Sequence, residues 1–134
     1  MYLSGYLNRM SRQELSIVRE AIAAQRSVLE SIEHSHAVWP LGLPAAEDGW
    51  IALGLSTDAA GSVGMHLTLW RRPGSDDRVV LPLPAYRGKQ LEIDEFFPRH
   101  QHGWSWVWDA AAGELMVTTT ATTPSARVLS IRAI

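Results

Sequence analysis

The sequence predicts a mainly β protein: an antiparallel β-sandwich of about seven strands, of the Greek-key type, preceded by one long N-terminal α-helix. Three observations predict it. The first 36 residues carry apolar side chains at helical spacing. A Trp-Pro-Leu-Gly-Leu-Pro run at 39–44 ends this pattern. Beyond that run the apolar residues recur every 2 residues instead of every 3.6. Short alternating segments separated by turn sequences at regular spacing are typical of a sandwich.

The helix is predicted from residue 12 to about residue 33, a stretch without glycine or proline. Ser11 and Glu14 have the spacing of a capping box, in which each side chain satisfies a free backbone N–H. Two adjacent apolar stripes follow, one made of Leu15, Val18, Ile22, Leu29 and Ile32 and the other of Ile17, Ala21, Ala24 and Val28. Together they exceed the apolar face of roughly 100° that a surface helix buries. We therefore expect neighbours on two sides of this helix.

The predicted organisation has three parts. Residues 1–36 read as a terminal strand remnant and a helix, 37–49 as a linker, and 50–134 as the sandwich. The seven strands are expected at 50–56, 63–71, 78–83, 91–97, 104–109, 114–121 and 127–133. Turns are expected at 58–61, 73–76 and 109–113, with Gly113 suited to a positive φ.

Composition excludes several classes of function. The net charge of −2, with both signs interspersed, argues against a nucleic-acid partner, which needs a basic patch. No apolar run of membrane-spanning length is present, and the N-terminus does not read as a signal peptide, so no membrane partner is expected. The lack of cysteine fits a cytoplasmic location. Nucleotide-binding, zinc-protease and serine-hydrolase motifs are missing, so no cofactor is expected.

A row of tryptophans is the most conspicuous candidate for binding. Trp104, Trp106 and Trp108 alternate and therefore share one face of a strand. Such a row could stack on pyranose rings as a sugar-binding face, or it could form half of the sandwich core or cover the preceding helix. We favour the core because large aromatic side chains are mostly buried. On the same grounds we interpret as structural the three remaining tryptophans, Trp39, Trp50 and Trp70.

Histidines occur in two pairs with one residue between the members, His34/His36 and His100/His102. Such a pair on a strand could bracket a metal ion. The first pair ends a helix, where such residues point in different directions, and the second lies in an expected loop. With no third ligand evident, no metal site is predicted.

Carboxylates could perform glycosidic chemistry if two of them flanked the bond to be cleaved. The candidates by type are Asp94, Glu95, Asp109 and Glu114. Asp109 falls in a turn, Glu114 opens a strand, and Asp94 and Glu95 point to opposite faces. We interpret them as turn residues and solvated positions, so no catalytic residue is assigned.

The order of segments carries a family resemblance. Ser-Gly-Tyr-Leu-Asn-Arg-Met-Ser at 4–11, Gln-Glu-Leu at 13–15 and the long helix resemble the end of a catalytic barrel, where a final strand leads into the last helix. The run at 39–44, Asp-Gly-Trp-Ile-Ala-Leu-Gly-Leu at 48–55, and segments 63–72 and 106–117 resemble a C-terminal antiparallel domain. This order is similar to the C-terminal part of family 36 glycoside hydrolases, the α-galactosidase-like enzymes.

The resemblance implies a retaining enzyme whose two catalytic aspartates end earlier barrel strands, upstream of Met1. The chain alone is then expected to be inactive and to brace its own catalytic barrel, its implied partner. The full-length enzyme would hydrolyse α-galactoside oligosaccharides. Tyr6, Asn8 and Arg9 would lie nearest the active-site face of the barrel, since they follow its final strand.

Two alternatives from other classes stay open. The first is a carbohydrate-binding module that uses Trp104, Trp106 and Trp108. The second is an interaction domain that forms a homo-oligomer through the apolar helix, because exposed patches of that size invite association.

Overall fold

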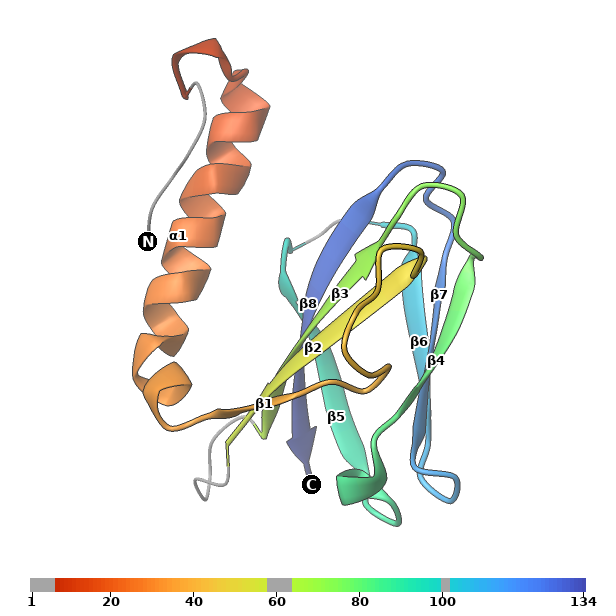
Figure 1. Cartoon of the computed structure of the whole chain (residues 1–134). Coiled ribbons are helices and arrows are strands. Elements are labelled where there is room, and N and C mark those ends of the chain that lie inside the picture. The colour runs from red at the N-terminus through yellow and green to blue at the C-terminus, as the bar shows by residue number, and fades with distance from the viewer. Residues whose placement is uncertain (1–6, 58–63, 100–101) are drawn as a thin grey trace.

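The computed structural model describes residues 7–57, 64–99 and 102–134. In these residues the protein is mainly β, with eight antiparallel strands in two sheets and one long helix at the N-terminal side. The helix stands beside one sheet, and the second sheet lies on the far side of the first (Figure 1). The predicted fold class is confirmed.

The helix α1 (Arg12–Glu33) follows a short 3-10 turn, η1 (Leu7–Arg9), and begins where the capping box predicts. The Glu14 N–H donates to Oγ of Ser11, and the Ser11 N–H donates to the Glu14 carboxylate. The hydrogen bond from the Ser11 N–H is the main cause that lowers the pKa of Glu14 below its usual value. None of the 22 residues of α1 is buried. Within the described ranges, no helix has the length and apolar character needed to cross a membrane.

The strands divide into sheets of five and three. Sheet A contains, in spatial order, β1 (His36–Val38), β2 (Trp50–Ser56), β3 (Met65–Arg71), β8 (Ser125–Ala133) and β5 (Leu91–Phe97). Sheet B contains β4 (Arg78–Pro82), β7 (Glu114–Thr119) and β6 (Trp104–Asp109). The 3-10 turn η2 (Pro84–Tyr86) connects β4 to β5. Because β8 lies between β3 and β5, and β7 between β4 and β6, distant segments are paired in both sheets, as in Greek-key winding.

The sequence placed most elements correctly. The bounds of α1, β2, β5 and β6 agree with the prediction, and the other predicted strands differ at their ends by up to two residues within the described ranges. One strand was missed: β1 pairs with β2 across the boundary between the segments interpreted as helix, 1–36, and linker, 37–49. The turn at 109–113 forms as expected, with the Asp109 carboxylate accepting two backbone N–H bonds and Gly113 at φ 72°. The expected turn at 58–61 lies outside the described residues.

The core lies between the two sheets. Alternate residues of β3 are buried, and so are alternate residues of β7 and β8, because successive strand side chains point to opposite faces. The largest fully buried side chains are Leu67, Leu69, Leu81, Leu115, Val117, Leu129 and Ile131. The sandwich therefore has an ordinary apolar interior.

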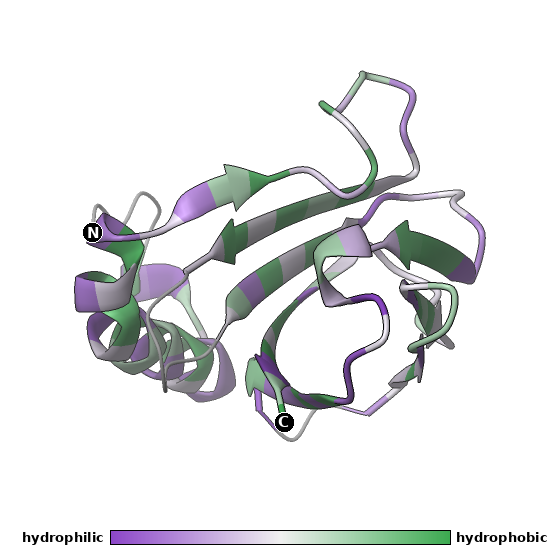
Figure 2. Cartoon of the chain, turned by 90° about the horizontal axis from the view of Figure 1, so that it is seen from below, coloured by the Kyte–Doolittle hydropathy of each residue, from purple (hydrophilic) through white to green (hydrophobic). Residues whose placement is uncertain are grey.

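The helix covers part of the outer face of sheet A. Val28 and Ile32 of α1 lie opposite Leu55, Thr68 and Val128 across a crevice, and these three strand residues alternate with core positions. Seen from below, α1 stands to one side of the closed sandwich (Figure 2). The architecture is thus three layers: helix, sheet A and sheet B.

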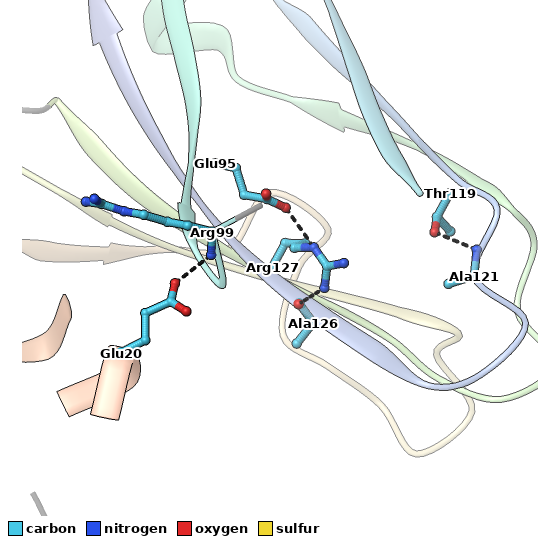
Figure 3. A network of polar contacts seen from close by, with 7 residues as sticks. All are labelled: Glu20, Glu95, Arg99, Thr119, Ala121, Ala126 and Arg127. Carbon is cyan, nitrogen blue, oxygen red and sulfur yellow. Dashed lines mark hydrogen bonds and ion pairs between the residues drawn. The ribbon is translucent and has the colours of Figure 1, made fainter. Parts of the chain in front are cut away.

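A buried ion pair lies inside the sandwich (Figure 3). Nε of Arg127 on β8 is 2.8 Å from Oε1 of Glu95 on β5, and both side chains are largely hidden from solvent. The Nε–H is not aligned with this oxygen, so the contact is an ion pair without hydrogen-bond geometry. The guanidinium also lies over the ring of Trp104, 5.3 Å from its centroid. Trp104 in turn meets Trp50 edge to face.

Removing one member of this pair should destabilise the fold strongly. We expect Glu95→Ala to lower the free energy of unfolding by about 3–5 kcal/mol, because Arg127 would be left charged and buried. Glu92→Ala is the matched control on the same strand, since Glu92 pairs with Arg132 at the surface, where both side chains are about half exposed. The control should cost about 0–1 kcal/mol. Urea denaturation measures both, and equal losses would contradict the account.

Candidate binding groove

The tryptophan row faces the interior of the sandwich. Trp104, Trp106 and Trp108 are partly buried and pack against the core cluster. The indole N–H of Trp106 donates to the Ile93 carbonyl and that of Trp108 to the Lys89 carbonyl. This placement favours the core interpretation of the row over an exposed sugar-binding face.

The residues expected near a barrel active site come from the N-terminal segment. Asn8 and Arg9 lie exposed in η1, ahead of the helix. Tyr6 lies outside the described residues. Sugar contacts at these positions therefore stay a prediction.

The candidate metal and acid–base residues are dispersed. His34 caps the end of α1, His36 opens β1, His102 is exposed, and His100 lies outside the described residues. Within the described ranges, no three His, Asp or Glu residues come together in a way that could hold a metal ion.

The four candidate carboxylates have separate settings. Asp94 and Glu114 are exposed, and Asp109 accepts backbone N–H bonds in its turn. Glu95 pairs with Arg127 inside the sandwich. Sequence reasoning found no partner for Glu95, because an arginine 32 positions later gives no local signal.

An open hollow lies on the outer face of sheet A, at the end that α1 does not cover. We call it the outer groove, an open depression of about 640 Å³ formed chiefly by Trp39, Pro44, Ile51, Trp70, Pro73 and Pro124. Trp70 stands between Ile51 of β2 and Ala126 of β8 in the strand register, so these three residues form the floor. Trp70 is 38% exposed, although the sequence suggested a structural role.

Arg71 connects two of the loops that form the groove wall by hydrogen bonds to their backbone carbonyls. Its Nε and Nη2 donate to the carbonyls of Asp76 and Ser75, which follow Pro73. Its Nη1 donates to the carbonyl of Ala121, in the loop that carries Pro124. The guanidinium thereby fixes the position of these two prolines relative to β3.

Arg72 holds the third loop, which carries Pro44. Its Nη1 is within hydrogen-bonding distance of the carbonyls of Ala45, Ala46 and Asp48. The Ser75 hydroxyl adds a bond from the neighbouring turn to the Gly49 carbonyl. Three loops from separate parts of the chain are therefore held together before any ligand arrives, which lowers the ordering cost of binding.

A second hollow, about 260 Å³, lies between α1 and the same sheet face. Its lining is apolar apart from Gln25, His66 and Thr68. Nδ1 of His66 is buried there without a hydrogen-bond partner in the described chain, and its ring stacks at a tilt on Phe96, 4.8 Å away. Burial lowers the pKa of His66 below its usual 6.5, because the charged imidazolium loses its hydration.

Comparisons with protein-family models, curated proteins and solved structures found no match for this chain. The resemblance to family 36 glycoside hydrolases therefore stays a prediction.

His66 should make stability depend on pH. Its pKa is lower in the folded chain than the unfolded value of about 6.5, so the unfolded chain binds more protons between the two pKa values. Its contribution to stability is complete above about pH 6.5 and is lost as the pH falls toward the folded pKa.

We expect urea denaturation to give a lower free energy of unfolding at about pH 5.5 than at about pH 7.5. His66→Gln should flatten this dependence, whereas His36→Gln, a control at an exposed histidine, should leave it unchanged. If His66→Gln leaves the pH dependence of the free energy of unfolding unchanged, the buried His66 side chain is not its cause.

Proposed function

We propose that the chain is a non-catalytic accessory domain of a larger, cytoplasmic, α-galactosidase-like glycoside hydrolase. In this role the sandwich braces the catalytic barrel, and α1 is the element in contact with it. The full-length enzyme would cleave terminal α-galactosides, and this chain would supply none of the reacting groups.

One observation carries the proposal: α1 has an apolar stripe that is at most half-buried, because Leu15, Val18 and Ile22 are partly exposed and Leu29 is exposed. The residues facing sheet A include Ala21, Ala24 and Val28. The other stripe lies about a quarter turn further around the helix axis and contains Leu15, Val18, Ile22 and Leu29, whereas its fifth member, Ile32, lines the crevice beside sheet A. Leu29 is 51% exposed, and no residue of the helix is buried.

A helix in this state lacks most of its usual support. Helices of this length are marginal in water on their own and gain most of their stability from packing an apolar face. The contacts of α1 with the sheet include one tether, a hydrogen bond from the Arg99 N–H to the Glu20 carboxylate (Figure 3). A neighbouring domain packed on this partly exposed stripe would bury the apolar side chains that the sandwich leaves accessible to solvent.

The same observation also fits a second candidate, a dimer formed by two copies of α1. Exposed apolar stripes on helices associate readily, and a twofold interface would bury Leu29 of both copies. The two candidates differ in what covers the stripe, so they can be separated by experiment.

The coding sequence upstream of Met1 tests the accessory role directly. We expect an open reading frame to continue in frame for about 250 residues with the alternating strand and helix pattern of a (β/α)8 barrel. Aspartates should follow at least two of those strands. An in-frame stop codon immediately upstream of Met1, with no barrel encoded by a neighbouring gene, would contradict the proposal.

The pure chain supplies a second test. We expect no turnover of p-nitrophenyl-α-galactoside and association in trans with the separately expressed barrel, measured by sedimentation velocity. Ile22→Asp should abolish that association, whereas Leu43→Asp, at a loop leucine that is 78% exposed, should not. If the chain alone sediments as a dimer that Ile22→Asp dissociates, the dimer is the correct interpretation. Measurable turnover by the chain would contradict both.

A further inference from the structure

The floor and walls of the outer groove are aromatic and apolar. The floor residues Ile51, Trp70 and Ala126 alternate with buried core positions of their strands, so they point away from the interior of the sandwich. Trp39 and three prolines from separate loops form the walls. The volume of about 640 Å³ falls within the range of about 300–1,000 Å³ that small-molecule sites occupy. The groove therefore has the size and lining of a ligand site.

The rim of the groove carries both signs of charge. Arg72 lines the groove and donates through Nη1 to three backbone carbonyls of the neighbouring loop. The same loop carries the carboxylates of Glu47 and Asp48. Arg71 adds no charge to the outer side, because it alternates with Trp70 along β3 and belongs to the inner face. The groove therefore favours an occupant without net charge.

Hydrogen-bonding groups of both kinds accompany the apolar floor. Nε and Nη2 of Arg72 make no hydrogen bond within the described chain. The indole N–H groups of Trp39 and Trp70 also make none there, in contrast to those of three inward-facing tryptophans. The exposed Glu47 carboxylate on the adjoining loop is an acceptor. A ligand that both donates and accepts around an apolar centre matches this arrangement.

We propose that the outer groove binds a neutral saccharide, with a pyranose ring stacked on Trp70 and its hydroxyl groups directed to the rim. One face of a pyranose consists of C–H groups, which the electron-rich face of an indole attracts. The hydroxyls around the ring both donate and accept. A wholly apolar ligand would displace water from the rim donors without replacing its hydrogen bonds. The proposal rests on the groove alone and does not depend on the accessory role.

A peptide strand fits this place less well. Extended peptides commonly add to the edge strand of a sheet, where backbone N–H and C=O groups are free. The floor of the groove lies on a sheet face, and its central strand β3 pairs with β2 on one side and β8 on the other. Its backbone groups are therefore already used in the sheet. The N–H groups of a peptide would find few acceptors here.

Titration with defined neutral oligosaccharides tests the proposal. The probes are cellohexaose, mannohexaose and the α-galactoside stachyose. We expect saturable binding of at least one of them by isothermal titration calorimetry, with a change in tryptophan fluorescence. Because the ligand is uncharged, raising the NaCl concentration from about 0.05 M to about 0.5 M should change its affinity by less than about twofold.

Variants locate the binding site. Trp70→Ala should weaken binding about tenfold or more, as expected for an indole at the centre of an interface. Trp39→Ala serves as a second variant from a different element, in case Trp70→Ala fails to fold. Val107→Ala is the control, because Val107 is an apolar residue, 59% exposed, on the outer face of sheet B. Near-ultraviolet circular dichroism confirms that each variant remains folded.

Three results would overturn the proposal. The first is no saturable binding of any of the three oligosaccharides, and the second is saccharide binding that neither tryptophan variant weakens. The third is an affinity that falls steeply with salt, which would place the ligand on charged groups. Binding of a decaproline peptide that depends on Trp70 and exceeds that of every saccharide would instead assign the groove to peptides. Association with the barrel is measured separately, so its failure leaves these results unchanged.

Discussion

Sheet A carries apolar residues on part of its outer face as well as on its inner face, and the rest of the structure depends on how each face is covered. A sheet with one solvated face alternates apolar and polar residues along each strand. In β2 and β8 the outward positions include Ile51, Leu55 and Val128, while the inward positions form the core. Sheet B covers the inner face, and α1 covers only one end of the outer face. The other end is the outer groove.

This constraint accounts for the placement of polar side chains as well. Arg127 and Glu95 satisfy each other between the sheets, where an isolated charge would be costly. Arg71 and Arg72 instead bind backbone carbonyls at the rim, and so shape the uncovered end of the sheet. The accessory role concerns the half-buried stripe of α1, whereas the outer groove lies at the end of sheet A that α1 does not cover.

Local chemistry explains why much of the fold could be predicted from the sequence. The bounds of α1 follow from a capping box and an uninterrupted helical pattern, and the β6–β7 turn follows from Asp109 and Gly113. The strand β1 escaped prediction because three residues between a helix and a proline-rich loop show no alternation. Its existence depends on pairing with β2, which is a tertiary contact.

The candidate site could not be predicted in the same way. The alternation of side chains along a strand shows that Trp104, Trp106 and Trp108 share a face. It also shows that Trp70 points away from the face of β3 that carries the core residues. It cannot show which face of a strand another element covers. The sequence therefore left a sugar-binding face open as an alternative for the inward row and favoured a structural role for Trp70, whereas Trp70 is exposed. The groove joins three loops through arginine contacts across up to 50 positions, which no local pattern encodes.

Amide hydrogen exchange of the isolated chain tests the central claim, that α1 lacks part of its cover, most directly. The account predicts that amides in the middle of α1 exchange through local opening, at a free energy well below that of β3 and β8 in the centre of sheet A. Protection of α1 equal to that of those strands would contradict it, because the helix would then already be fully supported by the sandwich.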